Sequence, residues 1–222
     1  MLSNDKLIFA VPRGRILGDV MPLMKRAGIE PEDSFWDKNA RQLSFSTSDP
    51  SLEIVRVRSF DIATLIAFGA AHIGIAGLDV LMEFESREIY APLDLGVGGC
   101  RMIVAQPEER APSDDPRRWS HIRIATKYPE ITRRHFAARG VHAECVKLNG
   151  AIEIAPAMGL CQRIVDLTST GDTLKANGLV EIEENAKITS RLAVNRTAFK
   201  TRGEEISGWI ERVREAVDAG QA

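Results

Sequence analysis

The 222-residue sequence predicts an α/β protein with two lobes. Short runs of branched apolar residues alternate with helix-length segments, an order typical of parallel strands joined by helices. The alternation breaks at Gly98-Gly99 and then resumes, which divides the chain into two strand–helix clusters. A folded chain of this length buries roughly 70% of the surface that its unfolded form exposes, so we expect a self-sufficient core.

The first cluster opens with a strand, and residues that favour helix ends punctuate it. Gly28 follows the first helical segment, and Ser59 is expected to cap the second. The expected strands are 6–11, 52–58 and 72–76, and the expected helices are 16–27, 59–68 and 78–84.

The second cluster contains a charged segment with two prolines, 108–119, which we interpret as an exposed excursion. The final helix carries Trp209 in an apolar stripe at helical spacing, which indicates core or subunit packing. The expected strands are 101–106, 122–126, 142–148, 163–166 and 187–195, and the expected helices are 128–139, 151–158 and 204–217.

Composition excludes several classes of protein. Lys and Arg number 29 against 31 Asp and Glu, so the net charge of -2 excludes a strongly basic nucleic-acid binder or a polybasic membrane-surface protein. Cys100, Cys145 and Cys161 are far apart and lack metal-site spacing, so we interpret them as buried, non-catalytic thiols. The sequence shows no secretory signal or membrane span, and the expected location is the cytoplasm.

The strongest local signal is a loop of hydroxyl groups that follows a buried strand ending at Asp166. Backbone N–H groups at the start of a helix can bind a phosphate, and Gly171 lets the backbone approach it closely. Asp166 can accept hydrogen bonds from two ribose hydroxyls. The alternative is a cluster that only caps the helix, because Ser and Thr favour helix starts. The loop carries Thr168, Ser169, Thr170, Gly171, Asp172 and Thr173.

A second signal is Pro12-Arg13-Gly14-Arg15, at the end of the first expected strand. In open α/β sheets this edge faces the ligand, and two arginines can bind a polyphosphate bidentately. The alternative is a turn with solvated arginines. Glu153 is a candidate general base or a simple first-turn carboxylate. Four further arginines near strands are each interpreted more readily as surface charges than as ligand contacts: Arg41, Arg56, Arg58 and Arg101.

Taken together, these segments resemble the ATP phosphoribosyltransferase family, which catalyses the first step of histidine biosynthesis. The most specific resemblance is the run from Ile164 to Leu179, which contains the hydroxyl-rich loop. Arg13 is a departure, because the family often carries Lys there, and the two side chains bind phosphate differently. The other similar segments are Pro12–Ile16, Val55–Arg58, Gly74–Leu81, Gly98–Arg101, Ile124–Pro129 and Glu153–Leu160.

The resemblance implies two lobes resembling type II periplasmic binding proteins, with the active site in the cleft between them. The first lobe would comprise residues 1–98 and 186–222, and the second residues 99–185 with the PRPP-binding loop. The chain looks like the short form of the catalytic subunit, without a histidine-binding domain. This form is expected to work as a homodimer within a larger hetero-oligomer that includes a regulatory subunit similar to histidyl-tRNA synthetase.

The implied reaction joins N1 of ATP adenine to C1 of 5-phosphoribosyl diphosphate (PRPP) and releases diphosphate. Arg15 and Arg41 are the expected catalytic residues, because they would stabilise the leaving diphosphate. Mg²⁺ is expected to arrive on the substrate phosphates rather than in a dedicated side-chain cage. PRPP would be bound by Glu153, Asp166 and residues 168–173, and ATP or diphosphate by Arg13, Gly14, Arg101 and Tyr128.

Two other functions compete with this interpretation. One is a bilobal effector-binding module without catalysis, in which the hydroxyl-rich loop would have no evident role. The other is a phosphoribosyltransferase of nucleobase salvage. Such enzymes usually carry two adjacent acidic residues before the phosphate loop, whereas Val165 precedes the single Asp166 here. Neither nucleic acid nor a membrane is an expected partner.

Overall fold

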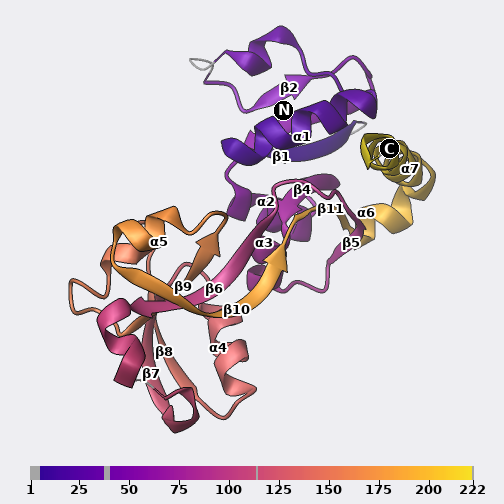
Figure 1. The fold of residues 1–222 in the computed structure, drawn as a ribbon. Coiled ribbons are helices and arrows are strands. Elements are labelled where there is room, and N and C mark those ends of the chain that lie inside the picture. Colours follow the sequence, from indigo (N-terminus) through magenta and orange to yellow (C-terminus); the bar gives the residue numbers. More distant parts are fainter. Residues whose placement is uncertain (1–5, 38–40, 114, 222) are drawn as a thin grey trace. The chain divides into compact units, whose positions relative to one another are not determined.

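The computed structural model describes residues 6–37, 41–113 and 115–221, and the chain divides into two compact units. Unit 1 comprises Met1–Gly98 and Thr189–Ala222, and unit 2 comprises Gly99–Ile188, so the chain passes between them twice. Each unit contains one sheet with helices packed against it (Figure 1). This arrangement is the α/β class that the alternation of strands and helices predicted.

The sheet of unit 1 has the strand order β2-β3-β1-β4-β11-β5. Strands β3, β1 and β4 are parallel, so their carboxyl ends lie at one edge of the sheet. All six residues of β1 are buried, because this central strand is covered on both faces. The strands are β1 (Leu7–Pro12), β2 (Ser44–Ser46), β3 (Leu52–Val57), β4 (Ile73–Gly77), β5 (Ile89–Asp94) and β11 (Ser190–Asn195).

Helices of unit 1 bury apolar side chains against both faces of this sheet. On one face, Leu23 of α1 and Trp209 of α7 belong to the same core cluster as Phe9. On the other face, Ile62 of α2 packs with Ala10. Trp209 is only 5% exposed, so the packing interpretation of the final helix is confirmed. The helices are α1 (Arg15–Arg26), η1 (Asp33–Trp36), α2 (Ser59–Ala67), α3 (Leu78–Phe84), α6 (Arg196–Thr201) and α7 (Gly203–Gln221).

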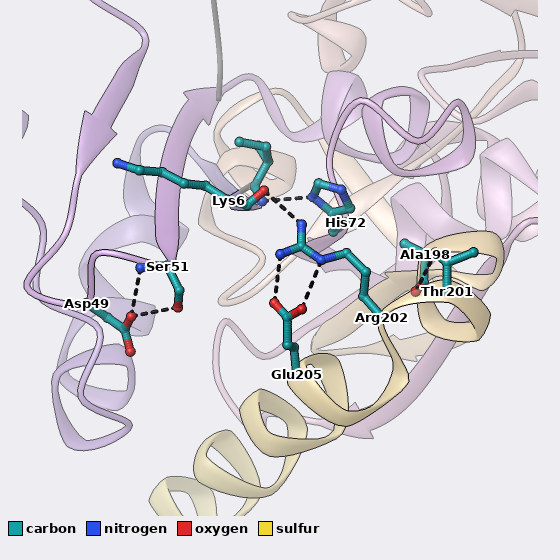
Figure 2. A network of polar contacts seen from close by, with 9 residues as sticks. Lys6, Asp49, Ser51, His72, Ala198, Thr201, Arg202 and Glu205 are labelled. Atoms are coloured by element: carbon teal, nitrogen blue, oxygen red, sulfur yellow. Dashed lines mark hydrogen bonds and ion pairs between the residues drawn. The ribbon is translucent and has the colours of Figure 1, made fainter. Parts of the chain in front are cut away.

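A polar network fixes the returning C-terminal segment to the start of the unit 1 sheet (Figure 2). The Arg202 guanidinium donates to the Lys6 carbonyl at 3.1 Å and pairs with Glu205 at 2.7 Å. His72 accepts a hydrogen bond on Nδ1 from the Ile8 backbone N–H at 2.9 Å. The turn between α6 and α7 is therefore held beside the first residues of β1.

Unit 2 contains the sheet β10-β6-β9-β7-β8. Strands β9, β7 and β8 are parallel, whereas β6 runs antiparallel to both β9 and β10. None of the helices in the described part of the chain is long and apolar enough to cross a lipid bilayer. The elements are β6 (Cys100–Pro107), η2 (Glu108–Ser113), η3 (Pro116–Arg118), β7 (His121–Thr126), α4 (Pro129–Ala137), β8 (His142–Lys147), η4 (Ile152–Ile154), β9 (Arg163–Thr168), α5 (Asp172–Ala176) and β10 (Leu179–Ile188).

The sequence misjudged the last strand. Residues 187–195 were expected to form one strand, but β10 ends at Ile188 in unit 2 and β11 begins at Ser190 in unit 1. The second crossing therefore falls between Ile188 and Thr189, where the sequence had placed it between 185 and 186. The reason is that β10 stays paired with β6 up to the pair Ile188 and Cys100.

Two helix predictions also need correction. Ser59 is the first residue of α2 rather than its cap, and Arg58 occupies the cap position without a side-chain hydrogen bond. The helix expected over 151–158 is reduced to the single 3₁₀ turn η4. Ala151 precedes this turn with a φ of 51°, a left-handed conformation that an α-helix cannot contain.

Candidate functional site

The hydroxyl loop, residues 168–173, leaves the carboxyl end of β9 and turns back on its own side chains. The Gly171 N–H donates to Thr168 Oγ1 at 3.1 Å, and the Asp172 N–H donates to Thr170 Oγ1 at 3.4 Å. These two hydroxyls bind backbone N–H groups of the loop, whereas the cap residue of α5 is Gly171, which makes no side-chain cap. Ser169, Thr170 and Thr173 are exposed. The loop is ordered by its own hydrogen bonds and still presents polar groups at its surface.

Gly171 shows why this loop needs a glycine. Its φ of +82° lies in the left-handed region, and a Cβ placed on it would meet no described atom within 4 Å. The backbone is therefore approachable at this residue. Helix α5 begins at Asp172 and has only five residues. Its dipole contributes little, so an anion here would depend on loop N–H and hydroxyl groups.

Asp166 lies half-buried on β9, two residues before the loop. Strand alternation places Asp166 and Thr168 on the same face of the sheet. The Leu167 N–H donates to Asp166 Oδ1 at 2.8 Å, which fixes the carboxylate at the end of the strand. A carboxylate held in this way beside the loop can accept hydrogen bonds from the hydroxyl groups of a sugar.

Arg101 reaches the same edge from the neighbouring strand, because it pairs with Thr168 in the register of β6 and β9. Its guanidinium binds Glu181 through both nitrogens, at 2.5 and 2.9 Å, and Glu184 at 3.1 Å. These two carboxylates raise the pKa of Arg101, chiefly through the hydrogen bonds to Glu181. Arg101 therefore braces β6 against β10, and its charge is compensated.

Glu153 lines a separate hollow of unit 2, with a volume of about 560 Å³. Glu153 is half-buried on η4, and its neighbour Ile152 shares a core cluster with Leu174 of α5. The hollow is acidic, which suits hydroxyl or amine groups better than phosphate. Its other polar side chains are those of Glu108, Glu109 and Asn177.

Tyr128 was expected to contact ATP or diphosphate, but it is buried. Its side chain is 2% exposed and lies within the fold of unit 2. The Tyr128 backbone precedes α4, accepts a hydrogen bond from Thr132 Oγ1 at 2.7 Å and donates one to Thr126 Oγ1 at 2.9 Å. These backbone contacts fix the start of α4, and a direct contact between the ring and ATP stays a prediction.

In unit 1, Arg13, Gly14 and Arg15 form the turn between β1 and α1. Gly14 has a φ of 86° and a ψ of -147°, a conformation that is essentially restricted to glycine. Arg13 and Arg15 are exposed on either side of it. The first turn of α1, which the structure describes in full, contains no acidic side chain. This helix start with two flanking arginines is suited to bind an anion.

Unit 1 also contains the other three candidate arginines, Arg41, Arg56 and Arg58. Pro12 pairs with Val57, so exposed Arg58 leaves β3 at the sheet edge where Arg13 leaves β1. Arg41 is exposed in the segment before β2. Arg56 is half-buried rather than the surface charge that the sequence suggested, because its guanidinium packs against the Phe35 and Phe45 rings, which contact each other edge to face. No local sequence signal could reveal this packing, because Phe35 lies 21 residues before Arg56.

The cysteines are less buried than expected, because Cys100 and Cys145 are half-buried. Cys161 is buried, and burial raises the pKa of its thiol, which disfavours the reactive thiolate. Cys145 makes weak contacts with the carbonyls of Pro129 and Ala143, at 3.7 and 3.8 Å. These surroundings agree with chemistry that depends on charge and positioning.

Known proteins with similar sequences decide the class. The sequence profile of the family described as ATP phosphoribosyltransferase matches residues 58–215. A protein of Rhodospirillum rubrum with this name is 67% identical over 215 residues, which cover 97% of this chain and 95% of that protein. The chain belongs to the ATP phosphoribosyltransferase family. A second relative of the same name, from Paramagnetospirillum magneticum, is 65% identical and is 99% covered.

A solved structure extends the likeness to the fold of an ATP phosphoribosyltransferase. The match is a chain of the ATP phosphoribosyl transferase (HisG:HisZ) complex from Thermotoga maritima, with a TM-score of 0.80 and 32% identity. It covers 96% of this chain and 99% of that one. These findings confirm the expected pentosyltransferase of histidine biosynthesis. They set aside both the effector-binding module and the nucleobase-salvage enzyme.

Proposed function

We propose that the hydroxyl loop of unit 2 and the arginines of unit 1 carry the ATP phosphoribosyltransferase reaction of this chain. The observation that supports this most strongly is the loop after β9. It combines hydroxyl groups, a left-handed glycine with open space beside it and the fixed carboxylate of Asp166. These are the groups that a ribose carrying a 5′-phosphate needs.

In the proposed complex, residues 168–173 bind the 5′-phosphate of PRPP through loop N–H and hydroxyl groups. Asp166 accepts hydrogen bonds from the ribose hydroxyls, and Glu153 orients the ribose or the second substrate. The acidic hollow around Glu153 supports a contact with hydroxyl or amine groups there, and argues against a contact with phosphate. Asp172 lies in the first turn of α5 and contributes its backbone N–H rather than its carboxylate.

The reaction makes one bond and breaks one bond at C1 of the ribose. The lone pair of adenine N1 forms the C–N bond, while the electrons of the C–O bond leave with diphosphate. Neutral N1 is already nucleophilic, so the attack needs no general base. The largest task is to stabilise negative charge on the leaving diphosphate, which we assign to Arg15 and Arg41. Arg13 and the Gly14 backbone would hold ATP or diphosphate.

The support for Arg101 and Tyr128 as ligand contacts is weaker than for the other residues. Arg101 already binds two carboxylates, and the Tyr128 ring is buried. We therefore propose that both residues hold the backbone around the site instead of contacting substrate. Arg101 would hold β6 beside Thr168, and Tyr128 would hold the start of α4.

We propose that Mg²⁺ enters the site on the substrate phosphates. In the described ranges of the chain, no three His, Cys, Asp or Glu side chains are grouped so as to hold a metal ion. An ion carried mainly by phosphate oxygens needs no such group of side chains. When bound, the ion supplies positive charge to the diphosphate, beside that of the arginines.

The proposed partner is a regulatory subunit similar to histidyl-tRNA synthetase. The Thermotoga maritima chain that this protein resembles was solved as a HisG:HisZ complex. Since the match covers 99% of that chain, the same kind of partnership is proposed here, with the catalytic chain as a homodimer within the larger assembly.

An absorbance assay tests the proposed reaction. The purified chain is mixed with PRPP, Mg²⁺ and either ATP or a panel of free nucleobases, with the regulatory subunit present in a parallel series. We expect phosphoribosyl-ATP absorbance with ATP only. Product from a nucleobase, or none from ATP in either series, would contradict the proposal.

A further inference from the structure

Arg56 of unit 1 has no role in the proposed reaction, yet its side chain is held by several contacts. Its Cζ lies 5.0 Å from the centre of the Phe35 ring and 5.0 Å from the centre of the Phe45 ring. Its Nη1 donates a hydrogen bond to the Phe35 carbonyl. The guanidinium therefore packs beside an edge-to-face pair of rings and is also hydrogen-bonded to the backbone, so its position is fixed by the chain itself.

Arg56 binds the chain on both sides of Arg41. Its side chain holds the Phe35 carbonyl, six residues before Arg41, and its backbone N–H donates to the Leu43 carbonyl at 2.8 Å. Phe45 continues from Leu43 into β2, where it pairs with Ile54 of β3. One residue of β3 thus fixes the segment that enters and the segment that leaves Arg41.

The same residue also contacts the other arginine-bearing segment of unit 1. Arg13 Nε donates to the Arg56 carbonyl at 3.2 Å, and the Arg13 N–H donates to the Val57 carbonyl at 2.9 Å. Burial lowers the pKa of Arg56, and the nearby Arg13 charge lowers it further, whereas Asp37 opposes both. Arg56 remains charged, because an arginine in a protein is not deprotonated.

We propose that Arg56 is a positioning residue that holds Arg41 in place beside the turn of Arg13 and Arg15. This inference rests on the proposed function, in which Arg41 stabilises the leaving diphosphate. Arg41 itself is exposed, so the flanks held by Arg56 set where its charge lies. A charge displaced by about 1 Å loses much of its effect on a transition state, which makes such an anchor important for rate.

The geometry requires arginine rather than lysine. A planar guanidinium can pack against two aromatic rings and still donate in its own plane to a carbonyl. A lysine ammonium is a point charge without a flat face, so it cannot fill both roles at once. We therefore expect Arg56→Lys to behave more like Arg56→Met than like the natural protein.

The test is a double-mutant cycle between Arg56→Met and Arg41→Ala, supported by limited trypsin digestion. A matched control is Arg212→Met, because Arg212 also lies over an aromatic ring of unit 1, that of Trp209, at 4.6 Å. Arg212 pairs with Asp49, which precedes β3, whereas Arg56 lies near the end of that strand. Turnover, KM for both substrates and thermal midpoint are measured for each folded variant.

We expect Arg56→Met to lower kcat about 10- to 100-fold with little change in KM. In the Arg41→Ala background the same change should cost less than about 2-fold, because it acts through Arg41. Trypsin should cleave after Arg41 faster in Arg56→Met and in Arg56→Lys. The Arg212→Met control should match the natural protein in both rate and cleavage.

Three results would overturn the inference, and each has a distinct meaning. Unchanged cleavage after Arg41 would show that Arg56 does not anchor this segment, whatever the reaction is. Faster cleavage with a loss of rate that simply adds to that of Arg41→Ala would show that the anchor does not act through Arg41. A natural protein that makes no phosphoribosyl-ATP, even with its partner, would refute the proposed function and with it the role of Arg41.

Discussion

At the scale of single residues, Gly171 allows the backbone requirement to be separated from the proposed phosphate contact. Asparagine tolerates a left-handed φ, so Gly171→Asn should fold, but its side chain would occupy the open space beside the loop. We expect the Kd for PRPP to rise about 10-fold or more, equivalent to one lost charge-assisted hydrogen bond. Isothermal titration with PRPP and Mg²⁺ measures it.

Gly140→Asn is the matched control for this prediction. Gly140 follows α4 in the same unit, has a φ of +73°, and a Cβ there would also meet no described atom within 4 Å. It should leave the PRPP affinity unchanged. Equal affinities for the two folded variants would contradict the assignment of the phosphate to residues 168–173.

The proposed leaving-group residues make a second prediction at this scale. Arg15→Ala or Arg41→Ala should slow turnover by roughly 10²–10³, the loss typical of one transition-state electrostatic donor. Both side chains are exposed, so the thermal midpoint should change little. Single-turnover rates under saturating substrate check this, and near-normal rates for both variants would refute the assignment.

The sequence predicted the segments whose backbone conformation is set locally. The run from Asp166 to Thr173 and the turn at Gly14 carry their own signals, because glycine, hydroxyl groups and a preceding strand are visible in the sequence. The contact of Arg56 with the Phe35 ring and the burial of Tyr128 depend on packing between distant segments. The carboxylates that bind Arg101 lie on β10, a strand whose start the sequence did not predict.

At the scale of elements, Asn195 connects β11, α6 and α2 in unit 1. Its Oδ1 accepts from the Ala198 N–H at 2.7 Å, and its Nδ2 donates to the Ile66 carbonyl at 2.7 Å. The residue is 4% exposed, so both groups would be left unsatisfied in Asn195→Ala. We expect a loss of about 1–3 kcal/mol in the free energy of unfolding, measured in urea.

Asn195→Asp provides the comparison for that measurement. It keeps the oxygen that caps α6 but places a carboxylate against the Ile66 carbonyl, so it should also be destabilised. Activity per folded molecule should stay near normal in both variants, because Asn195 belongs to none of the segments that carry the proposed site. An alanine variant as stable as the natural protein would show that this connection contributes nothing.

His72 predicts a pH dependence of stability in the same region (Figure 2). Burial lowers the pKa of His72, and the nearby Arg202 charge lowers it further, while Glu205 opposes them. The unfolded chain, with a histidine pKa near 6.5, then binds the proton more readily than the folded chain. The stabilisation is present above about pH 6.5 and is lost as the pH falls from there toward the lower folded pKa.

Urea unfolding at several pH values checks the His72 prediction against His72→Asn. Asparagine can offer Oδ1 to the Ile8 N–H in place of Nδ1 but does not titrate. The pKa of His135 is also lowered, mainly by burial, so only the difference between the two proteins reports on His72. Identical pH profiles would refute this role.

Most helices of unit 1 could be predicted, because glycines mark their ends and apolar periodicity marks their buried faces. The pairing in unit 2 could not. Alternation predicted parallel strands, but β6 runs antiparallel to β9 and β10. β10 carries charged residues along most of its length, including Glu181, Glu183 and Glu184, so its composition resembles that of a loop. Its pairing with β6 and its ion pair with Arg101 stabilise it as a strand.

At the scale of the whole molecule, the match to a chain of a HisG:HisZ complex predicts where regulation resides. Allostery requires a second site whose ligand biases the first, and we place the histidine site in the partner subunit. The purified chain should therefore be insensitive to millimolar histidine, and inhibition should appear when the regulatory subunit is added. Mass photometry confirms that the chain is free of partner. Clear inhibition of the partner-free chain would refute this assignment.

The bond that forms is the most direct test of the central claim. The chain, with its regulatory subunit, is incubated with ATP labelled with ¹⁵N at adenine N1 and PRPP labelled with ¹³C at ribose C1. We predict that NMR will show a one-bond coupling between the two labels, together with one diphosphate released per product. Labels that remain uncoupled in unchanged substrates, or a product joined through another nitrogen, would contradict the account.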